Sequence, residues 1–156
     1  MRVLRALIVL AIVALPCNVS ARDKLCAPLR NFVASVQPGQ TRSLEFHTNW
    51  GGGFKDSKRP DLVIYEKRCD SHDYAQATAV CELLMQNGAV EFSGENAKRA
   101  LTCLSPATVF GGHVQLERGE FSFHYGSDDR GSNLTLKYDE DHEIGGAVLT
   151  ITARGY

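Results

Sequence analysis

The sequence lacks the short motifs by which many small enzymes are recognised. It contains no Gly-x-Ser-x-Gly, His-Glu-x-x-His or Ser-x-x-Lys segment, which excludes the usual local signatures of serine hydrolases, zinc proteases and penicillin-binding enzymes. It also has no Cys-x-x-Cys pair, a spacing that zinc sites favour. We therefore expect no metal and no cofactor, and the sequence favours a protein that is not an enzyme.

An excess of charge of one sign is missing too. The 156 residues include 17 lysines and arginines and 18 aspartates and glutamates, for a formal net charge of −1. Proteins that bind nucleic acid through its phosphates carry a clear cationic excess. The balance found here predicts no nucleic-acid partner.

Long hydrophobic runs are absent after residue 15. The one long run, Ala6–Leu15, follows the basic residues Arg2 and Arg5 and precedes the small residues Val19-Ser20-Ala21. This order is typical of a secretory signal peptide, and the run is shorter than the roughly 18 residues that span a bilayer. We predict a signal peptide over residues 1–21.

Removal of this peptide changes the arithmetic of the chain. Residues 22–156 are then a single exported domain, periplasmic or secreted, without stable membrane insertion. A lipid attached at Cys17 is an alternative that the preceding Pro16 disfavours, because cleavage sites take small residues. The remaining 135 residues carry four cysteines and a net charge of −3.

Four cysteines in an exported chain predict two disulfides, because the compartment outside the cytoplasm is oxidising. Three pairings are open, and the spacing along the sequence does not choose between them. We favour Cys69 with Cys81 and Cys26 with Cys103.

Apolar residues recur at helical spacing in three segments. The first helix begins at Pro28 and ends at Pro38-Gly39, the second runs from about His72 to Asn87, and the third follows Ser93 and ends before Ser105. Strands are expected over Thr41–His47 and Leu62–Glu66, and four more over residues 108–117, 120–125, 133–138 and 147–153, where apolar residues alternate with polar ones.

The turns between the last four segments set apolar residues opposite one another. A first turn at Arg118-Gly119 places Val114 opposite Phe123, the next turn pairs Phe121 with Tyr138 and Phe123 with Leu136, and the last pairs Leu136 with Leu149 and Leu134 with Ile151. Three turns therefore place apolar residues on one face of a four-stranded C-terminal meander. We predict an α+β domain in which two or three amphipathic helices pack on one face of an antiparallel sheet, with two disulfides.

The same register places two histidines together on the polar face. His113 and His124 are expected opposite each other, and Lys137 lies on the same face. Two imidazoles and a lysine are groups that can cleave a phosphodiester by acid–base catalysis. The sequence thus admits a small secreted hydrolase, ribonuclease-like in architecture, as an alternative function.

The loop over Asn49–Arg59 suggests a different function. It holds three consecutive glycines and several charges, which predicts a mobile loop, and it carries Trp50, the only tryptophan, with Phe54 close by. Aromatic side chains on a surface loop are typical anchors for a protein partner. We favour a non-enzymatic exported protein that binds another macromolecule, a protein or another envelope component of unknown identity, as inhibitor- and immunity-type envelope proteins do.

Overall fold

The computed structural model describes residues 23–156, and the predicted signal peptide and Cys17 lie outside the described residues. In chain order the elements are α1 (Cys26–Ser35), β1 (Thr41–Trp50), the 3-10 turn η2 (Pro60–Leu62), β2 (Tyr65–Asp70), α2 (Ala75–Asn87), α3 (Gly94–Leu104), β3 (Gly119–Gly126), β4 (Gly131–Glu140) and β5 (Ala147–Gly155).

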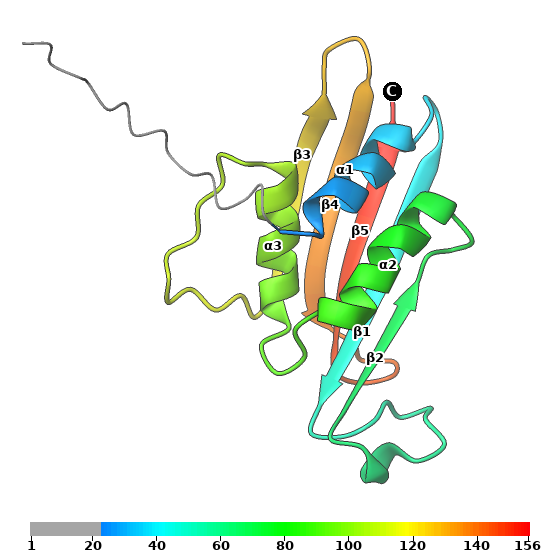
Figure 1. Ribbon diagram of the computed structural model, residues 1–156, viewed down its shortest axis with the longest axis vertical. Coiled ribbons are helices and arrows are strands. Elements are labelled where there is room, and N and C mark those ends of the chain that lie inside the picture. Colours follow the sequence, from blue (N-terminus) through cyan, green and yellow to red (C-terminus); the bar gives the residue numbers. More distant parts are fainter. Residues whose placement is uncertain (1–22) are drawn as a thin grey trace, which may run out of the picture.

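The five strands form one antiparallel sheet in the order β2-β1-β5-β4-β3. The three helices lie on the same face of this sheet, and no helix of residues 23–156 covers the opposite face (Figure 1). The last three strands follow one another as a meander. The predicted α+β class, with helices on one face of an antiparallel sheet, is confirmed.

The expected strand over residues 108–117 is wrong. These residues form turns and irregular backbone, so that the meander has three strands rather than four. Two of their apolar side chains, those of Phe110 and Leu116, pack against the core instead. The Val114 carbonyl accepts a hydrogen bond from Lys98 Nζ of α3 at 2.6 Å.

The remaining registers differ from the expected ones by two residues. Phe123 lies opposite Leu134 rather than Leu136, and Leu136 lies opposite Ile151 rather than Leu149. A shift of two residues leaves every side chain on its face of the sheet, whereas a shift of one would invert all of them. The predicted apolar face is therefore the one that the helices cover.

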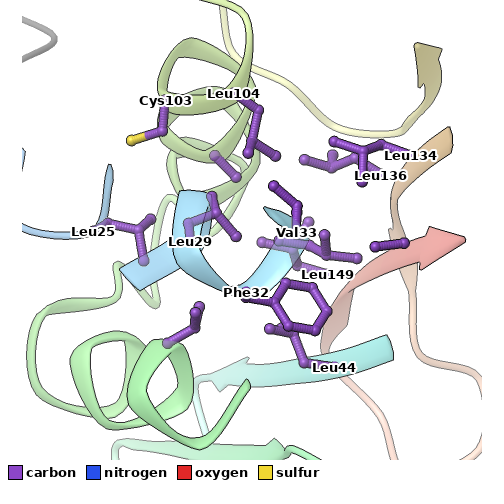
Figure 2. Close-up of a cluster of buried hydrophobic side chains, with 14 of the residues drawn as sticks. Leu25, Leu29, Phe32, Val33, Leu44, Cys103, Leu104, Leu134, Leu136 and Leu149 are labelled. Atoms are coloured by element: carbon purple, nitrogen blue, oxygen red, sulfur yellow. The ribbon is translucent and has the colours of Figure 1, made fainter. Parts of the chain in front are cut away.

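The core lies between the helices and the sheet. Leu29, Phe32 and Val33 of α1 are fully buried and point toward Leu44 and Leu149 on the sheet (Figure 2). They fall on one stripe of the helix, as the 3.6-residue period requires. Helix α1 therefore supplies the centre of the core, and α2 and α3 flank it (Figure 1).

Both favoured disulfides are confirmed. Cys26 at the start of α1 is bonded to Cys103 near the end of α3, and Cys69 of β2 is bonded to Cys81 of α2. Each bridge joins two elements that also pack together, so the covalent links reinforce the layer of helices on the sheet.

Candidate functional site

A group of exposed apolar side chains lies at the far end of the β1–β2 hairpin. We call it the hairpin patch, and it consists of five side chains that are between 41% and 73% exposed: Trp50, Leu62, Val63, Ile64 and Tyr65. The connection that carries them projects beyond the end of the sheet (Figure 1). Exposed apolar side chains gathered at one end of a soluble protein often mark an interaction site.

Two aromatic rings form the base of the hairpin patch. Trp50 ends β1 and Tyr65 begins β2, and the two are direct partners in the antiparallel ladder. Their rings stack with centroids 6.5 Å apart and an angle of 19° between the planes. Since each ring holds the other in place, little conformational freedom is left to lose when a partner binds.

Backbone hydrogen bonds join the two halves of the connection, residues 51–64. The Gly51 N–H donates to the Ile64 carbonyl at 2.9 Å, and the Gly53 N–H donates to the Pro60 carbonyl at 2.6 Å. A Cβ atom at Gly53 would lie 2.8 Å from the Cα atom of Pro60, so the two halves of the connection approach more closely than any larger residue allows. The loop predicted to be mobile is therefore folded back on itself.

Side chains from the two strands hold this loop from below. The Glu66 carboxylate accepts hydrogen bonds from the Phe54 N–H, at 2.8 Å, and from the Ser57 hydroxyl. Its cross-strand partner Asn49 donates from Nδ2 to the Gly53 carbonyl at 2.6 Å. Both anchoring residues belong to regular strands, so the position of the loop is set by the sheet.

Phe54 is not on the surface, in contrast to the expectation for this aromatic residue. Its side chain is fully buried beneath the loop, with the Arg68 guanidinium 4.9 Å from the ring centroid and the edge of the His47 ring nearby. Arg68 is held there by two hydrogen bonds to Asp56. Phe54 is thus the hydrophobic anchor of the loop, while Trp50 is half exposed and available for contact.

A second turn, residues 141–146, meets the loop from the other side. The Lys55 N–H and Nζ donate to the carbonyls of Ile144 and His142, at 2.8 and 2.9 Å. Asp141 of this turn lies 2.7 Å from Nδ1 of His47 on β1. The acidic turn that follows β4 therefore supports the loop.

The carboxyl of Asp141 is nearly buried, and its charge is held by hydrogen bonds. Burial opposes ionisation, but the amides of Ile144 and Glu143 and the His47 ring outweigh it and lower the pKa of Asp141 below its ordinary value. Because all these donors belong to the loop-supporting turn or to β1, the ionised carboxylate fastens the two together.

The residues of the hydrolase hypothesis are not brought together. His113 lies in the irregular segment after α3 and is exposed, whereas His124 of β3 pairs with Asn133 of β4, its Nδ1 2.5 Å from the amide oxygen. Lys137 lies four residues beyond Asn133, about 13 Å along the strand. The expected opposition of His113 and His124 is wrong because the strand that would carry His113 does not form.

The open face of the sheet carries a row of hydroxyls rather than an acid–base pair. The residues in register across four strands are Ser122, Thr135, Thr152 and Ser43. Ser122 and Thr135 lie 3.4 Å apart. Beside His124 there is an open hollow of about 420 Å³, which it shares with Tyr156 and Asp128.

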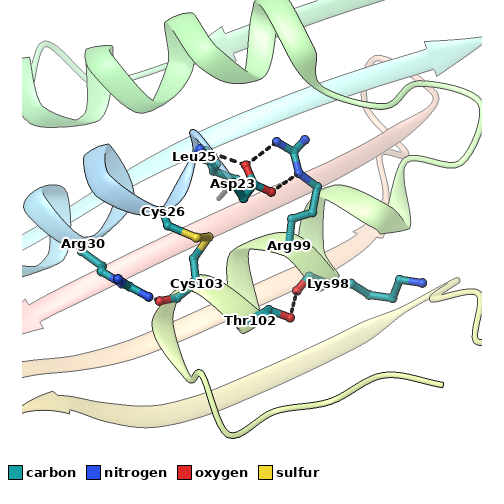
Figure 3. The surroundings of a disulfide bond; sticks show 8 residues. All are labelled: Asp23, Leu25, Cys26, Arg30, Lys98, Arg99, Thr102 and Cys103. Carbon is teal, nitrogen blue, oxygen red and sulfur yellow. Dashed lines mark hydrogen bonds and ion pairs between the residues drawn. A yellow bond between two sulfur atoms is a disulfide. The ribbon is translucent and has the colours of Figure 1, made fainter. Parts of the chain in front are cut away.

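A larger hollow, of about 560 Å³, lies between α3 and residues 106–112 beside the Cys26–Cys103 bridge. Its two cations already have partners. Arg99 donates to both carboxylate oxygens of Asp23, at 2.7 and 2.9 Å, and this contact lowers the pKa of Asp23 (Figure 3). Lys98 Nζ lies 2.5 Å from Glu95. The hollow therefore offers no uncompensated positive charge to an anionic ligand.

Two further features, a metal-binding cluster and a membrane-spanning helix, are absent from residues 23–156. No group of three or more histidine, cysteine, aspartate or glutamate side chains is arranged to hold a metal ion in that part of the chain. Nor is any helix of that part both long and apolar enough to cross a bilayer. Comparison with protein-family models, with curated proteins and with solved structures found no match.

Proposed function

We propose that this chain is an exported, non-enzymatic protein that binds a partner protein through the hairpin patch, as inhibitor- or immunity-type envelope proteins do. The observation that carries the proposal is the exposure of five apolar side chains at one end of the molecule, where Trp50 stacks on Tyr65 and the Gly51 N–H donates to the Ile64 carbonyl. An ordered apolar surface avoids the entropy cost of ordering a loop on binding.

Export is part of the same proposal. The two disulfides support export, because such bonds form and persist in an oxidising compartment. The signal peptide expected over residues 1–21 would deliver the chain there.

A protein partner is favoured over a lipid surface by the residues around the patch. Trp, Tyr and Arg are the residues that contribute most to protein–protein binding energy, and Trp50, Tyr65 and Arg59 all lie at this end of the hairpin. Asp56 and Asp61 stand among Lys55, Lys58 and Arg59 in this loop, so charges of both signs surround the patch. We therefore expect a partner with an apolar pocket and polar groups of both signs at its rim.

The test compares variants of the purified domain, residues 22–156, in a capture experiment from envelope extract. Trp50→Ala and the double variant Leu62→Ser/Ile64→Ser remove parts of the patch. Val109→Ser is the matched control, because Val109 is 87% exposed but belongs to the segment beside α3. The proposal predicts a protein that wild type and control retain equally and that both patch variants lose by at least about tenfold, a change of about 1.4 kcal/mol in binding free energy.

The same variants decide between partner classes. Co-sedimentation with vesicles of anionic phospholipid is expected to be weak and independent of the patch. Patch-dependent vesicle binding without a patch-dependent protein would replace the proposal with a lipid-binding function. Retention of every captured protein by both patch variants would overturn it.

A further inference from the structure

The two edges of the sheet are protected to very different degrees. Strand β2, at one edge, is six residues long, includes Lys67 and Arg68, and is tied to α2 by the Cys69–Cys81 bridge. Strand β3, at the other edge, is eight residues long and contains no lysine, arginine or proline. Natural proteins use short strands, lysine and proline to prevent edge strands from pairing with other chains. The β3 edge has none of these devices.

The outward backbone groups of β3 can be assigned from the turn that follows it. Ser127 N–H donates to the Arg130 carbonyl at 3.0 Å, which continues the β3–β4 ladder by one pair. Hydrogen-bonded pairs alternate along an antiparallel ladder, so Phe121 and Phe123 direct their backbone groups toward β4. Glu120, Ser122 and His124 direct theirs outward. Among residues 23–156, no backbone hydrogen bond joins these three residues to another segment.

The segment that precedes β3 does not occupy this edge by pairing. Its backbone hydrogen bonds are internal, from Thr108 to Ser105 and from Val114 to Gly111. It runs beside α3 (Figure 1). The outer edge of β3 therefore presents backbone N–H and C=O groups that no other segment of residues 23–156 pairs with.

We propose that β3 pairs with β3 of a second copy of this chain, antiparallel and about a two-fold axis at Ser122. In that register Glu120 lies opposite His124 of the second copy, and Phe121 lies opposite its Phe123. The Nδ1 atom of His124 contacts Asn133, which leaves Nε2 to meet the facing carboxylate. An imidazole that carries a proton on Nε2 can donate to that carboxylate, so in this register the strand is complementary to itself in hydrogen bonding.

Other registers lack this match. A shift of two residues in one direction sets Glu120 opposite Gly126, and larger shifts set Glu120 or His124 opposite its own copy, which places like groups together. In the proposed register three outward residues of each strand form hydrogen-bonded pairs. This gives about six backbone hydrogen bonds and one continuous sheet of both copies.

The arrangement goes beyond the proposed function and does not depend on it. Strand β3 runs away from the end of the sheet that carries the hairpin patch (Figure 1). An antiparallel β3–β3 pair therefore directs the two patches to opposite ends of the dimer. An edge pairing buries less than the roughly 800 Å² per partner of a standard interface, so we expect a reversible dimer at roughly micromolar concentrations.

Sedimentation equilibrium of the purified domain, from about 1 to about 500 µM, measures the dimer directly. Ser122→Pro removes an outward N–H without removing a donor to β4, and is expected to leave the protein monomeric over this range. Ser122→Ala is the control and retains the wild-type constant. Circular dichroism establishes that each variant is folded.

Exchanging the two residues that face each other, Glu120 and His124, tests the register without a proline substitution. His124→Glu sets two pairs of like charges opposite one another and is expected to weaken the dimer by about tenfold. The double variant Glu120→His/His124→Glu restores opposite groups and is expected to restore the wild-type constant.

Each result decides the proposal. A wild-type protein that stays monomeric across the range overturns it, and so does a dimer that neither Ser122→Pro nor His124→Glu weakens. Trp50→Ala is expected to dimerise as wild type does, so a failure of the edge pairing and a failure of the hairpin-patch proposal are recorded separately.

Discussion

Two connections of fourteen residues each, 51–64 and 105–118, differ in how they are held. The first is fixed by side chains of regular strands: Glu66, Asn49 and Arg68 reach into it, and Phe54 is buried beneath it. The second has fewer such contacts: Lys98 of α3 donates to the Val114 carbonyl, and Asp139 of β4 pairs with Arg118 at its end. Both expose apolar residues, but only the first presents them as a group on an ordered backbone. Rigidity in a loop thus follows from the strands beneath it rather than from its own glycine content.

The two disulfides should differ more than any other pair of features in their effect on stability. Cys26 and Cys103 are 77 residues apart, and Cys69 and Cys81 are 12 apart. Because the entropy removed from the unfolded chain grows with loop length, Cys26→Ala/Cys103→Ala should cost about 4–5 kcal/mol and Cys69→Ala/Cys81→Ala about 3 kcal/mol. Urea unfolding monitored by circular dichroism measures both. Equal or inverted losses would contradict this loop-length account.

Removing the support of the first connection should free it locally. Glu66→Ala leaves the Phe54 N–H and the Ser57 hydroxyl without their acceptor, at a cost of about 2 kcal/mol. Hydrogen exchange of the Phe54 amide should accelerate accordingly, and the partner of the hairpin patch should bind more weakly. Glu66→Gln keeps an acceptor oxygen and should recover most of the protection.

The matched experiment on the second connection is Lys98→Ala. It removes the hydrogen bond to the Val114 carbonyl, the Glu95 ion pair and the Phe110 contact from a mostly exposed segment, so the expected loss is about 1 kcal/mol. Two results would refute the difference between the two connections. One is a hydrogen-exchange rate of the Phe54 amide that Glu66→Ala leaves unchanged, and the other is a loss of unfolding free energy from Lys98→Ala that exceeds the loss from Glu66→Ala.

Acid should loosen the turn that supports the first connection. The pKa of Asp141 is lowered in the folded protein, so its carboxylate contributes stability above the ordinary value of 3.8, and that contribution is lost as the pH falls through the folded value. Asp141→Asn should therefore flatten the fall in unfolding free energy below about pH 4, by less than the effect of Glu66→Ala. Asp128→Asn, in the exposed β3–β4 turn, is the matched substitution. Identical acid profiles for wild type and Asp141→Asn would contradict this role.

The sequence predicted those parts of the fold that depend on local periodicity. The stripe of Leu29, Phe32 and Val33 marked α1, and the alternation over residues 133–138 and 147–153 marked β4 and β5. The registers were displaced by two residues, because turn length cannot be read from apolar alternation alone. The face of each strand was nevertheless correct, and this is what positions the helices.

Segment 108–117 shows where this reasoning fails. Phe110 and Leu116 alternate as in a strand but pack against the helical layer, and alternation does not distinguish the two. Leu62 and Ile64 were expected in a strand and instead extend the exposed loop. The burial of Phe54 depends on Arg68 and Glu66, which only the β1–β2 pairing brings beneath the loop. Nothing local to residues 49–59 signals that contact.

The smallest expected changes in unfolding free energy come from substitutions of exposed apolar side chains. Ile64→Ser in the hairpin patch and Val109→Ser in the second connection both change an exposed apolar side chain, so each should alter the unfolding free energy by no more than about 0.5 kcal/mol. Thermal and urea unfolding measure this. Equal stability makes the binding result decisive, because any loss of partner then reflects contact rather than misfolding. If Ile64→Ser binds as wild type does and Val109→Ser does not, the ordered connection is only a structural feature and the loosely held one carries the interface.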